Sequence, residues 1–100
     1  MNRIRFTLQA DRDFIEIYQY IGSDNIAAAD RHHELLRSRC LDLVDQPRIG
    51  TMRDEIKPGL RSVAEGDYVI FYRIEDQDRV AILRLLHAKR DITKLTFSES

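Results

Sequence analysis

The segment VAILRLLH, residues 80–87, constrains the fold more than any other part of the chain. Six of its eight residues are apolar, and such a run is typical of a strand that is buried on both faces. A strand of this kind lies inside a sheet, with a neighbour on each side. We therefore expect the rest of the chain to build a sheet around this segment and to cover it with helices.

Three other segments have the period of strands. LRSVA, residues 60–64, turns through Glu-Gly-Asp into YVIFYRI, residues 68–74. YVIFYRI then turns through EDQD into RVAILRLLH, residues 79–87. Turns this short predict an antiparallel meander. The opening RIRFTL, residues 3–8, alternates apolar and polar residues, and we expect it to pair with the other side of the last strand.

Between the first strand and the meander, apolar residues recur at helical spacing. ADRDFIEIYQYIG, residues 10–22, predicts a helix of about three turns that ends at Gly22. A second helix then runs to about Val44, with Ser23 or Asp24 as its N-cap. The expected inner faces are Ala10, Phe14, Ile17, Tyr18 and Ile21 in the first helix, and Ala29, His33, Leu36, Cys40 and Leu43 in the second. Two helices joined by so short a turn form an αα-hairpin.

The order of these elements gives the fold class. We predict an α+β fold with an N-terminal strand and a helical hairpin packed on one face of a twisted, mainly antiparallel sheet. The length corresponds to a single domain over residues 1–100. The tail DITKLTF, residues 91–97, has Ile92, Leu95 and Thr96 at helical spacing but is too short to assign. The second face of the sheet is therefore expected to be open.

Charge and cysteine content exclude several classes of protein. The formal net charge is -1, so any contact with nucleic acid would need a local basic patch. One cysteine, Cys40, rules out a disulfide framework and is typical of a cytosolic protein, and its helical spacing predicts a core position. Neither a signal peptide nor a membrane span is expected. His32 and His33 point about 100° apart on a helix and have no third ligand, so we expect no metal and, without a Gly-rich loop, no cofactor.

Arg84 interrupts the apolar run of the last strand. Regular alternation puts it on one face with Val80, Ile82 and Leu86. A buried guanidinium without a partner is costly, so Arg84 must reach a carboxylate, carbonyl groups or solvent. We expect it on the face that the helices leave uncovered, where a partner protein would bind.

A cationic cluster follows at the end of the same strand. His87, Lys89 and Arg90 lie there, and Lys57 and Arg61 could join them from neighbouring segments. A histidine can transfer protons near neutral pH, and cations can bind phosphate or stabilise developing charge. The cluster is thus either a reactive site or the solvated end of a strand.

Several motifs in order resemble the ParE branch of the RelE/ParE toxin superfamily. The resemblance covers nearly the full chain. It is carried by Pro47-x-x-Gly50, Pro58-Gly59-Leu60-Arg61, the run from Tyr68 to Tyr72 followed by Arg73, and Arg84-Leu85-Leu86-His87 with Arg90-Asp91.

The resemblance implies the toxin of a bacterial type II toxin–antitoxin system, of the kind that stabilises plasmids. Its partners would be a ParD-like antitoxin, in a hetero-oligomer that meets DNA through the antitoxin, and DNA gyrase, which ParE-like toxins poison in the cytoplasm without an established catalytic group. RelE-like members instead cleave ribosome-bound mRNA. Here Val69 follows Tyr68 where those nucleases carry Arg, and no Tyr or His follows Asp91. These departures favour a gyrase inhibitor over an mRNA endoribonuclease, with an inactive protein-binding module as a third hypothesis.

The resemblance also assigns roles to residues as hypotheses. Target-binding residues would be Arg61, Arg84, His87, Lys89 and Arg90. Antitoxin-binding residues would be Phe14, Tyr18, Tyr68, Tyr72, Arg73 and Arg84. If the protein is a nuclease, its catalytic residues would be Lys57, Arg61, His87 and Arg90.

Overall fold

The last strand, β5 (Val80–His87), lies inside the sheet with a neighbour on each side, as predicted. A computed structural model of the chain describes residues 3–93 and 95–100. β5 pairs in parallel with β1 (Ile4–Phe6) and antiparallel with β4 (Tyr68–Ile74). Every residue of β5 except His87 is buried, because the strand is covered on both faces.

Two further strands complete the sheet in the order β1-β5-β4-β3-β2. β3 (Leu60–Glu65) pairs with β4 along its whole length, which confirms the predicted meander. β2 (Thr51–Met52) pairs with Ser62 and Arg61, in a stretch where the sequence patterns predicted no strand. Two exposed residues are too few for an alternating pattern, so the sequence carried no signal for β2.

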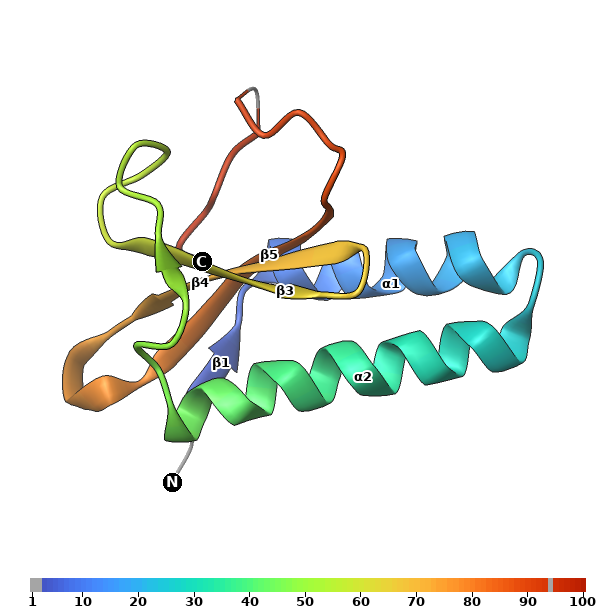
Figure 1. Cartoon of the computed structure of the whole chain (residues 1–100), viewed down its shortest axis with the longest axis horizontal. Helices are drawn as coiled ribbons and strands as arrows, with labels where there is room; N and C mark the ends of the chain where they lie inside the picture. The colour runs from blue at the N-terminus through green and yellow to red at the C-terminus, as the bar shows by residue number, and fades with distance from the viewer. Residues whose placement is uncertain (1–2, 94) are drawn as a thin grey trace.

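The two helices form the predicted hairpin on one face of the sheet (Figure 1). The helix α1 (Leu8–Gly22) begins earlier than expected, because Thr7 caps it by accepting a hydrogen bond from the Ala10 N–H. This start shortens the first strand and leaves Leu8 in the helix rather than in a strand. The helix α2 (Ile26–Asp45) follows after a short turn.

The predicted N-cap of α2, Ser23 or Asp24, is wrong. Ser23 has helical dihedral angles and donates its N–H to the carbonyl oxygens of Gln19 and Ile21, so it belongs to the end of α1. Asn25 is extended and accepts a hydrogen bond from the Ala28 N–H, which makes it the cap. The predicted inner faces are otherwise confirmed in Ala10, Phe14, Ala29, Leu36, Cys40 and Leu43, all of which are buried.

The predicted grouping of Arg84 with Val80 and Ile82 on one face is wrong, because β5 contains a bulge. Tyr72 pairs with Ile82 and Phe71 pairs with Arg84, so the pairing skips Leu83. Beyond the bulge the alternation changes phase. Leu85 therefore packs with Val80 and Ile82 in the core under the helices, and Leu86 packs in the second core.

The face of the sheet opposite the helices, called the tail face below, is not open as expected. The C-terminal segment leaves β5 and returns across the sheet (Figure 1). It forms no helix in its described residues, and it places Phe97 in a core with Phe71, Leu83, Leu86 and Leu60, flanked by Ile92 and Leu95. The chain thus covers the tail face with its own tail.

No helix in the described residues has the length and apolar composition needed to cross a lipid bilayer.

Candidate functional site

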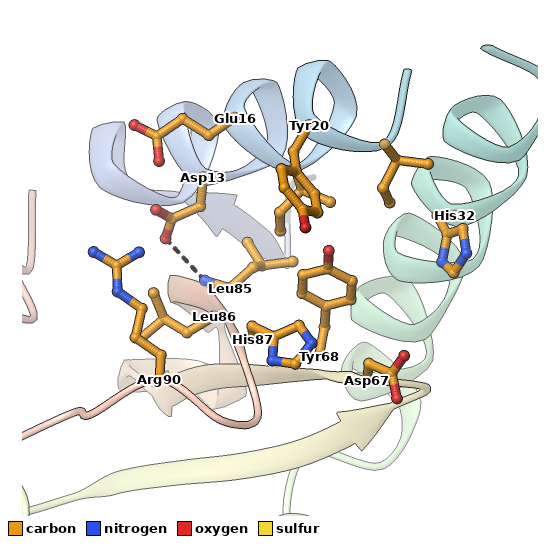
Figure 2. A pocket seen from close by; sticks show the side chains of 12 residues that line it. Asp13, Glu16, Tyr20, His32, Asp67, Tyr68, Leu85, Leu86, His87 and Arg90 are labelled. Carbon is orange, nitrogen blue, oxygen red and sulfur yellow. Dashed lines mark hydrogen bonds between the residues drawn. The ribbon is translucent and has the colours of Figure 1, made fainter. Parts of the chain in front are cut away.

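A cleft of about 700 Å³ lies where α1 passes the ends of β4 and β5. Figure 2 shows Asp13, Glu16 and Tyr20 on α1, with Tyr20 pointing toward Tyr68 and Asp13 toward Leu85 of the sheet. The rest of the lining is Ile17, Ile21, His32, Asp67, Leu86, His87 and Arg90. The cleft therefore combines aromatic rings with charges of both signs.

At one end of the cleft, Asp13 and Arg84 form a buried ion pair. The carboxylate of Asp13 accepts hydrogen bonds from Arg84 Nε (2.8 Å) and Arg84 Nη2 (3.0 Å). It also accepts one from the N–H of Leu85 at 3.0 Å (Figure 2). The third guanidinium nitrogen, Nη1, donates to the carbonyl oxygen of Thr96 at 2.9 Å. The hydrogen bond with Asp13, opposed by burial, raises the pKa of Arg84 above its ordinary value, so the guanidinium stays charged.

This ion pair follows from the shortness of β1. Because β1 ends at Phe6, the edge of β5 beyond Ile82 has no strand beside it. Side chains of the capping residue and of α1 take over instead. The Thr7 hydroxyl donates to the carbonyl oxygen of Leu83 at 2.9 Å, and Asp13 accepts from the Leu85 N–H. Buried backbone groups that lose a ladder partner require such replacements.

Tyr68 and His87 form the floor of the cleft as a cross-strand pair. Their rings meet edge to face with centroids 5.4 Å apart. Burial raises the pKa of Tyr68 above its ordinary value, so its phenol is protonated at neutral pH and can donate a hydrogen bond. Nδ1 of His87 accepts the Lys89 N–H at 3.1 Å. The neutral imidazole therefore carries its proton on Nε2.

The predicted nuclease residues do not gather at one place. His87 and Arg90 line the cleft. Arg61 pairs with Tyr72 near the other end of β4, four residues or about 13 Å along the strand from Tyr68. There it donates to the carbonyl oxygens of Arg48 (3.2 Å) and Gly50 (3.1 Å). Lys57 lies on the tail face, where it contacts Phe97 and Glu99.

The residues predicted to bind a target are also divided. His87, Lys89 and Arg90 are exposed together at the end of β5, as the sequence indicated. Arg84 is buried and paired with Asp13, so the expectation that it faces a partner on an open surface is wrong. Arg61 lies apart from them at the opposite end of β4.

Among the predicted antitoxin-binding residues, Tyr72 and Phe14 are buried in the core under the helices. The Tyr72 hydroxyl donates to the carbonyl oxygen of Pro47 and accepts the N–H of Gly50, so Tyr72 has no accessible surface for a partner. Tyr18 is half-buried and donates to Asp30. Arg73 lies partly exposed on the tail face beside Glu99.

Sequence reasoning missed Asp13, Glu16 and Tyr20. A signal for Asp13 existed, because it lies three residues after Ala10 and four before Ile17, within the apolar stripe of α1. An acid on a buried helix face and an arginine in a buried strand predict a pair. Glu16 and Tyr20 had no comparable signal, since exposed residues of a helix carry little pattern.

Comparison with known sequences places most of the chain in one family. Residues 4–92 match the sequence profile described as the ParE toxin of the type II toxin–antitoxin system, parDE. Curated relatives named Toxin ParE1, from the CDC 1551 / Oshkosh and ATCC 25618 / H37Rv strains of Mycobacterium tuberculosis, are each 38% identical over 48 residues. That segment is 48% of this chain and 49% of the relative. The matched region thus spans about half the length of these curated relatives.

Solved structures agree with the fold. The chain is similar to one from the chromosomal ParDE TA system from P. aeruginosa, with a TM-score of 0.74 and 20% identity over 89% of this chain and 98% of that one. It is also similar to a chain of the toxin–antitoxin complex RelBE2 from Mycobacterium tuberculosis, with a TM-score of 0.63 and 31% identity over 84% of this chain and 94% of that one. These matches confirm the predicted α+β architecture.

Proposed function

Because the chain belongs to the ParE family of toxins from type II toxin–antitoxin systems, we propose that it inhibits DNA gyrase and that a ParD-like antitoxin neutralises it. The action takes place in the bacterial cytoplasm, where gyrase works. The toxin and antitoxin form a hetero-oligomer that meets DNA through the antitoxin. The similarity to chains of the ParDE and RelBE2 systems supports an antitoxin partner.

The separation of the predicted nuclease residues in the structure is the observation that favours gyrase inhibition over mRNA cleavage. Phosphodiester cleavage needs a proton-transfer group and phosphate-binding cations within contact of one phosphate. Here Lys57 and Arg61 lie away from His87 and Arg90. Tyr68, whose ring meets that of His87 edge to face, has its pKa raised by burial, which disfavours the phenolate that could accept a proton. An inhibitor that acts by binding a target protein needs no such convergence.

One observation favours the alternative of a ribosome-dependent mRNA endoribonuclease. His87 and Arg90 do share the cleft, and the Nε2–H of His87 is free of the contact with Lys89. A nuclease built from these two residues alone would lack the remaining cations that the superfamily uses.

The test is a pair of assays with the purified chain. In the first, gyrase and relaxed plasmid are incubated with the toxin, and supercoiled and cleaved plasmid are measured on a gel. We expect loss of supercoiling and accumulation of cleaved DNA, with full rescue by the cognate antitoxin. In the second, a translation extract is tested for mRNA cleavage, and we expect none.

Substitutions at the end of β5 sharpen the test. Lys89→Glu with Arg90→Glu removes two exposed cations and should weaken gyrase inhibition at least tenfold. Arg48→Ala, which removes an exposed cation away from this end, is the control and should leave inhibition unchanged. Cleavage of mRNA that His87→Ala abolishes, with gyrase unaffected, would reverse the proposal. If the chain neither inhibits gyrase nor causes mRNA cleavage, the protein is an inactive binding module.

A further inference from the structure

One buried tyrosine of the cleft has a hydroxyl without a hydrogen-bond partner in the described chain. Tyr68 is 7% exposed, yet Tyr18 and Tyr72 are the tyrosines whose hydroxyls bond to other described residues. Every fully buried polar side-chain atom among the described residues has a partner, so the Tyr68 hydroxyl must reach the open space of the cleft. Because a buried phenol ordinarily has a hydrogen-bond partner, a ligand in the cleft would supply the missing one.

A second phenol points toward Tyr68 from the other side of the cleft (Figure 2). Tyr20 of α1 is 77% exposed and lines the cleft. Tyrosine is enriched where proteins bind one another, because its ring gives a large contact area and its hydroxyl makes a polar contact. Two phenols that face one another across an opening indicate a binding site.

A carboxylate without a counter-ion lies at the same end of the cleft. Asp67 precedes Tyr68 in the turn between β3 and β4 and lies beside it in Figure 2. It takes part in none of the ion pairs among the described residues. His32 of α2 also lines this end. The end formed by Tyr20, Asp67 and Tyr68, called the tyrosine end below, therefore carries an unpaired negative charge.

The opposite end of the cleft holds the positive charge. Arg90 lies there with Asp13 and Glu16 (Figure 2). Asp13 is neutralised by Arg84, so Arg90 and Glu16 balance one another. The cleft thus has a mixed end without net charge and a tyrosine end that attracts cations.

Arginine is the side chain that fits the tyrosine end best. The carboxylate and the phenol oxygens accept hydrogen bonds, and the faces of the rings attract cations. A guanidinium offers five N–H donors on a planar cation that bonds to carboxylates and stacks on rings, whereas lysine offers a compact charge. Ile17 and Ile21 also line the cleft, and the methylene stem of an arginine would pack on such a wall.

We propose that the tyrosine end binds an arginine side chain of the target protein, DNA gyrase. An enzyme that acts on DNA holds the phosphates with arginine and lysine, so such side chains are common on the surface where the target works. The tyrosine end is continuous with the exposed cations Lys89 and Arg90 through His87 and Arg90, which line the same cleft. The inference rests on the proposed function for the identity of the partner. It adds the site and the chemistry that the site recognises.

The site is tested with the full isotope-labelled chain and small blocked amino acids. N-acetyl-arginine methylamide is titrated into the chain, and NMR follows the amide signals of Tyr20, Asp67 and Tyr68. The matched probe is N-acetyl-citrulline methylamide, which keeps the shape of arginine and lacks its charge. We expect the arginine probe to bind at least fivefold more tightly than the citrulline probe. Equal affinity of the two probes overturns the proposal.

Three substitutions locate the site. Tyr20→Leu, Asp67→Asn and Tyr68→Phe should each weaken binding of the arginine probe at least threefold. Tyr68→Phe should do so without lowering Tm, because its hydroxyl has no partner to lose, and a lower Tm would contradict the proposal. Asp76→Asn, the control, changes an exposed acid in the turn between β4 and β5 and should bind the probe like the wild type. Equal losses in Asp76→Asn and Asp67→Asn would show that the probe responds to overall charge and not to this site.

The partner is tested in the gyrase assay. The double variant Tyr20→Leu/Asp67→Asn should inhibit gyrase at least tenfold less than the wild type, and Asp76→Asn should inhibit equally. A double variant that no longer binds the arginine probe but inhibits gyrase fully overturns the assignment of gyrase to this site. The titration contains no gyrase, so a wild-type chain that binds the probe and leaves gyrase active contradicts the proposed target and not the site.

Discussion

The buried ion pair between Asp13 and Arg84 gives a prediction about stability. Their side chains are 5% and 10% exposed, so neither charge is solvated if the other is removed. In Asp13→Ala, Arg84 keeps its bond to the Thr96 carbonyl oxygen but loses its counter-charge, and the Leu85 N–H loses its acceptor. Removing one partner of a buried pair costs about 3–5 kcal/mol. We expect a loss of this size in the free energy of unfolding.

The loss should be plain in thermal and urea denaturation. A domain of this length changes its Tm by roughly 5 °C per kcal/mol, so Asp13→Ala should lower Tm by about 15–25 °C. The loss is a large part of the total stability of a small domain, typically about 5–15 kcal/mol.

A double-mutant cycle separates the pair from the cost of an isolated charge. Asp13→Leu combined with Arg84→Met removes both charges and keeps apolar volume, and it should be at least ~2 kcal/mol more stable than the sum of the single losses predicts. The exposed pair Arg48–Asp78 is the control, with side chains 63% and 50% exposed, and Arg48→Ala should cost less than about 1 kcal/mol. A cost below ~1 kcal/mol for Asp13→Ala, or strict additivity in the cycle, would refute the reasoning.

Three shorter predictions follow from single contacts. Burial raises the pKa of the Cys40 thiol to about 12. A thiol reagent at pH 8 should therefore label Cys40 only as fast as the chain unfolds. Rapid labelling of the native chain would contradict the prediction. The hydrogen bond from Arg5 lowers the pKa of Glu75 below its usual 4.5. The ionised Glu75 therefore stabilises the fold fully above pH ~4.5, and this stabilisation is lost as the pH falls through the lower pKa of the folded state. Glu75→Gln should for this reason make the free energy of unfolding fall less steeply at acid pH. A Cβ at Gly50 would collide with the Tyr72 hydroxyl and lie 2.9 Å from the Ser62 carbonyl oxygen. Gly50→Ala should therefore lower the free energy of unfolding in urea by about 1–3 kcal/mol. An unchanged free energy would show that the Pro47–Gly50 loop moves freely.

The sequence predicted the architecture because its signals were local and repeated. The helical stripe through Phe14 and the apolar run of β5 recur over many residues, and each extra turn or pair of residues adds to the same pattern. The order of strands then followed from short turns and from the need to bury β5 on both sides. Such arguments need no knowledge of individual contacts.

Arg84 shows where this reasoning stopped. Its predicted grouping with Val80 and Ile82 assumed strict alternation, and one extra residue at Leu83 reversed the phase of all that follows. Nothing in the letters AILR marks a bulge. The carboxylate of Asp13 was needed because β1 is short, and the length of β1 was set in turn by the Thr7 cap.

The tail face was mispredicted for a different physical reason. The tail contributes one buried ring, Phe97, and one paired carboxylate, Glu99, and two such positions form no helical or strand period. Single contacts between residues far apart in the sequence produce no periodic pattern, so they cannot be predicted from periodicity. The prediction of the candidate site failed for a similar reason. Lys57, Arg61 and His87 belong to motifs that follow one another in the sequence, but the fold places these side chains apart.

The pairing of β1 with β5 bears on how the toxin comes into being. Thr7 and Leu83, joined by a hydrogen bond, are 76 residues apart, so the sheet closes only after β5 has been made. Contacts between such distant segments form slowly compared with a helical hairpin. A ribosome that stops early would release a fragment with α1 and α2 but without a finished sheet. We expect such fragments to leave gyrase active, so that the proposed inhibition begins only once β5 is present.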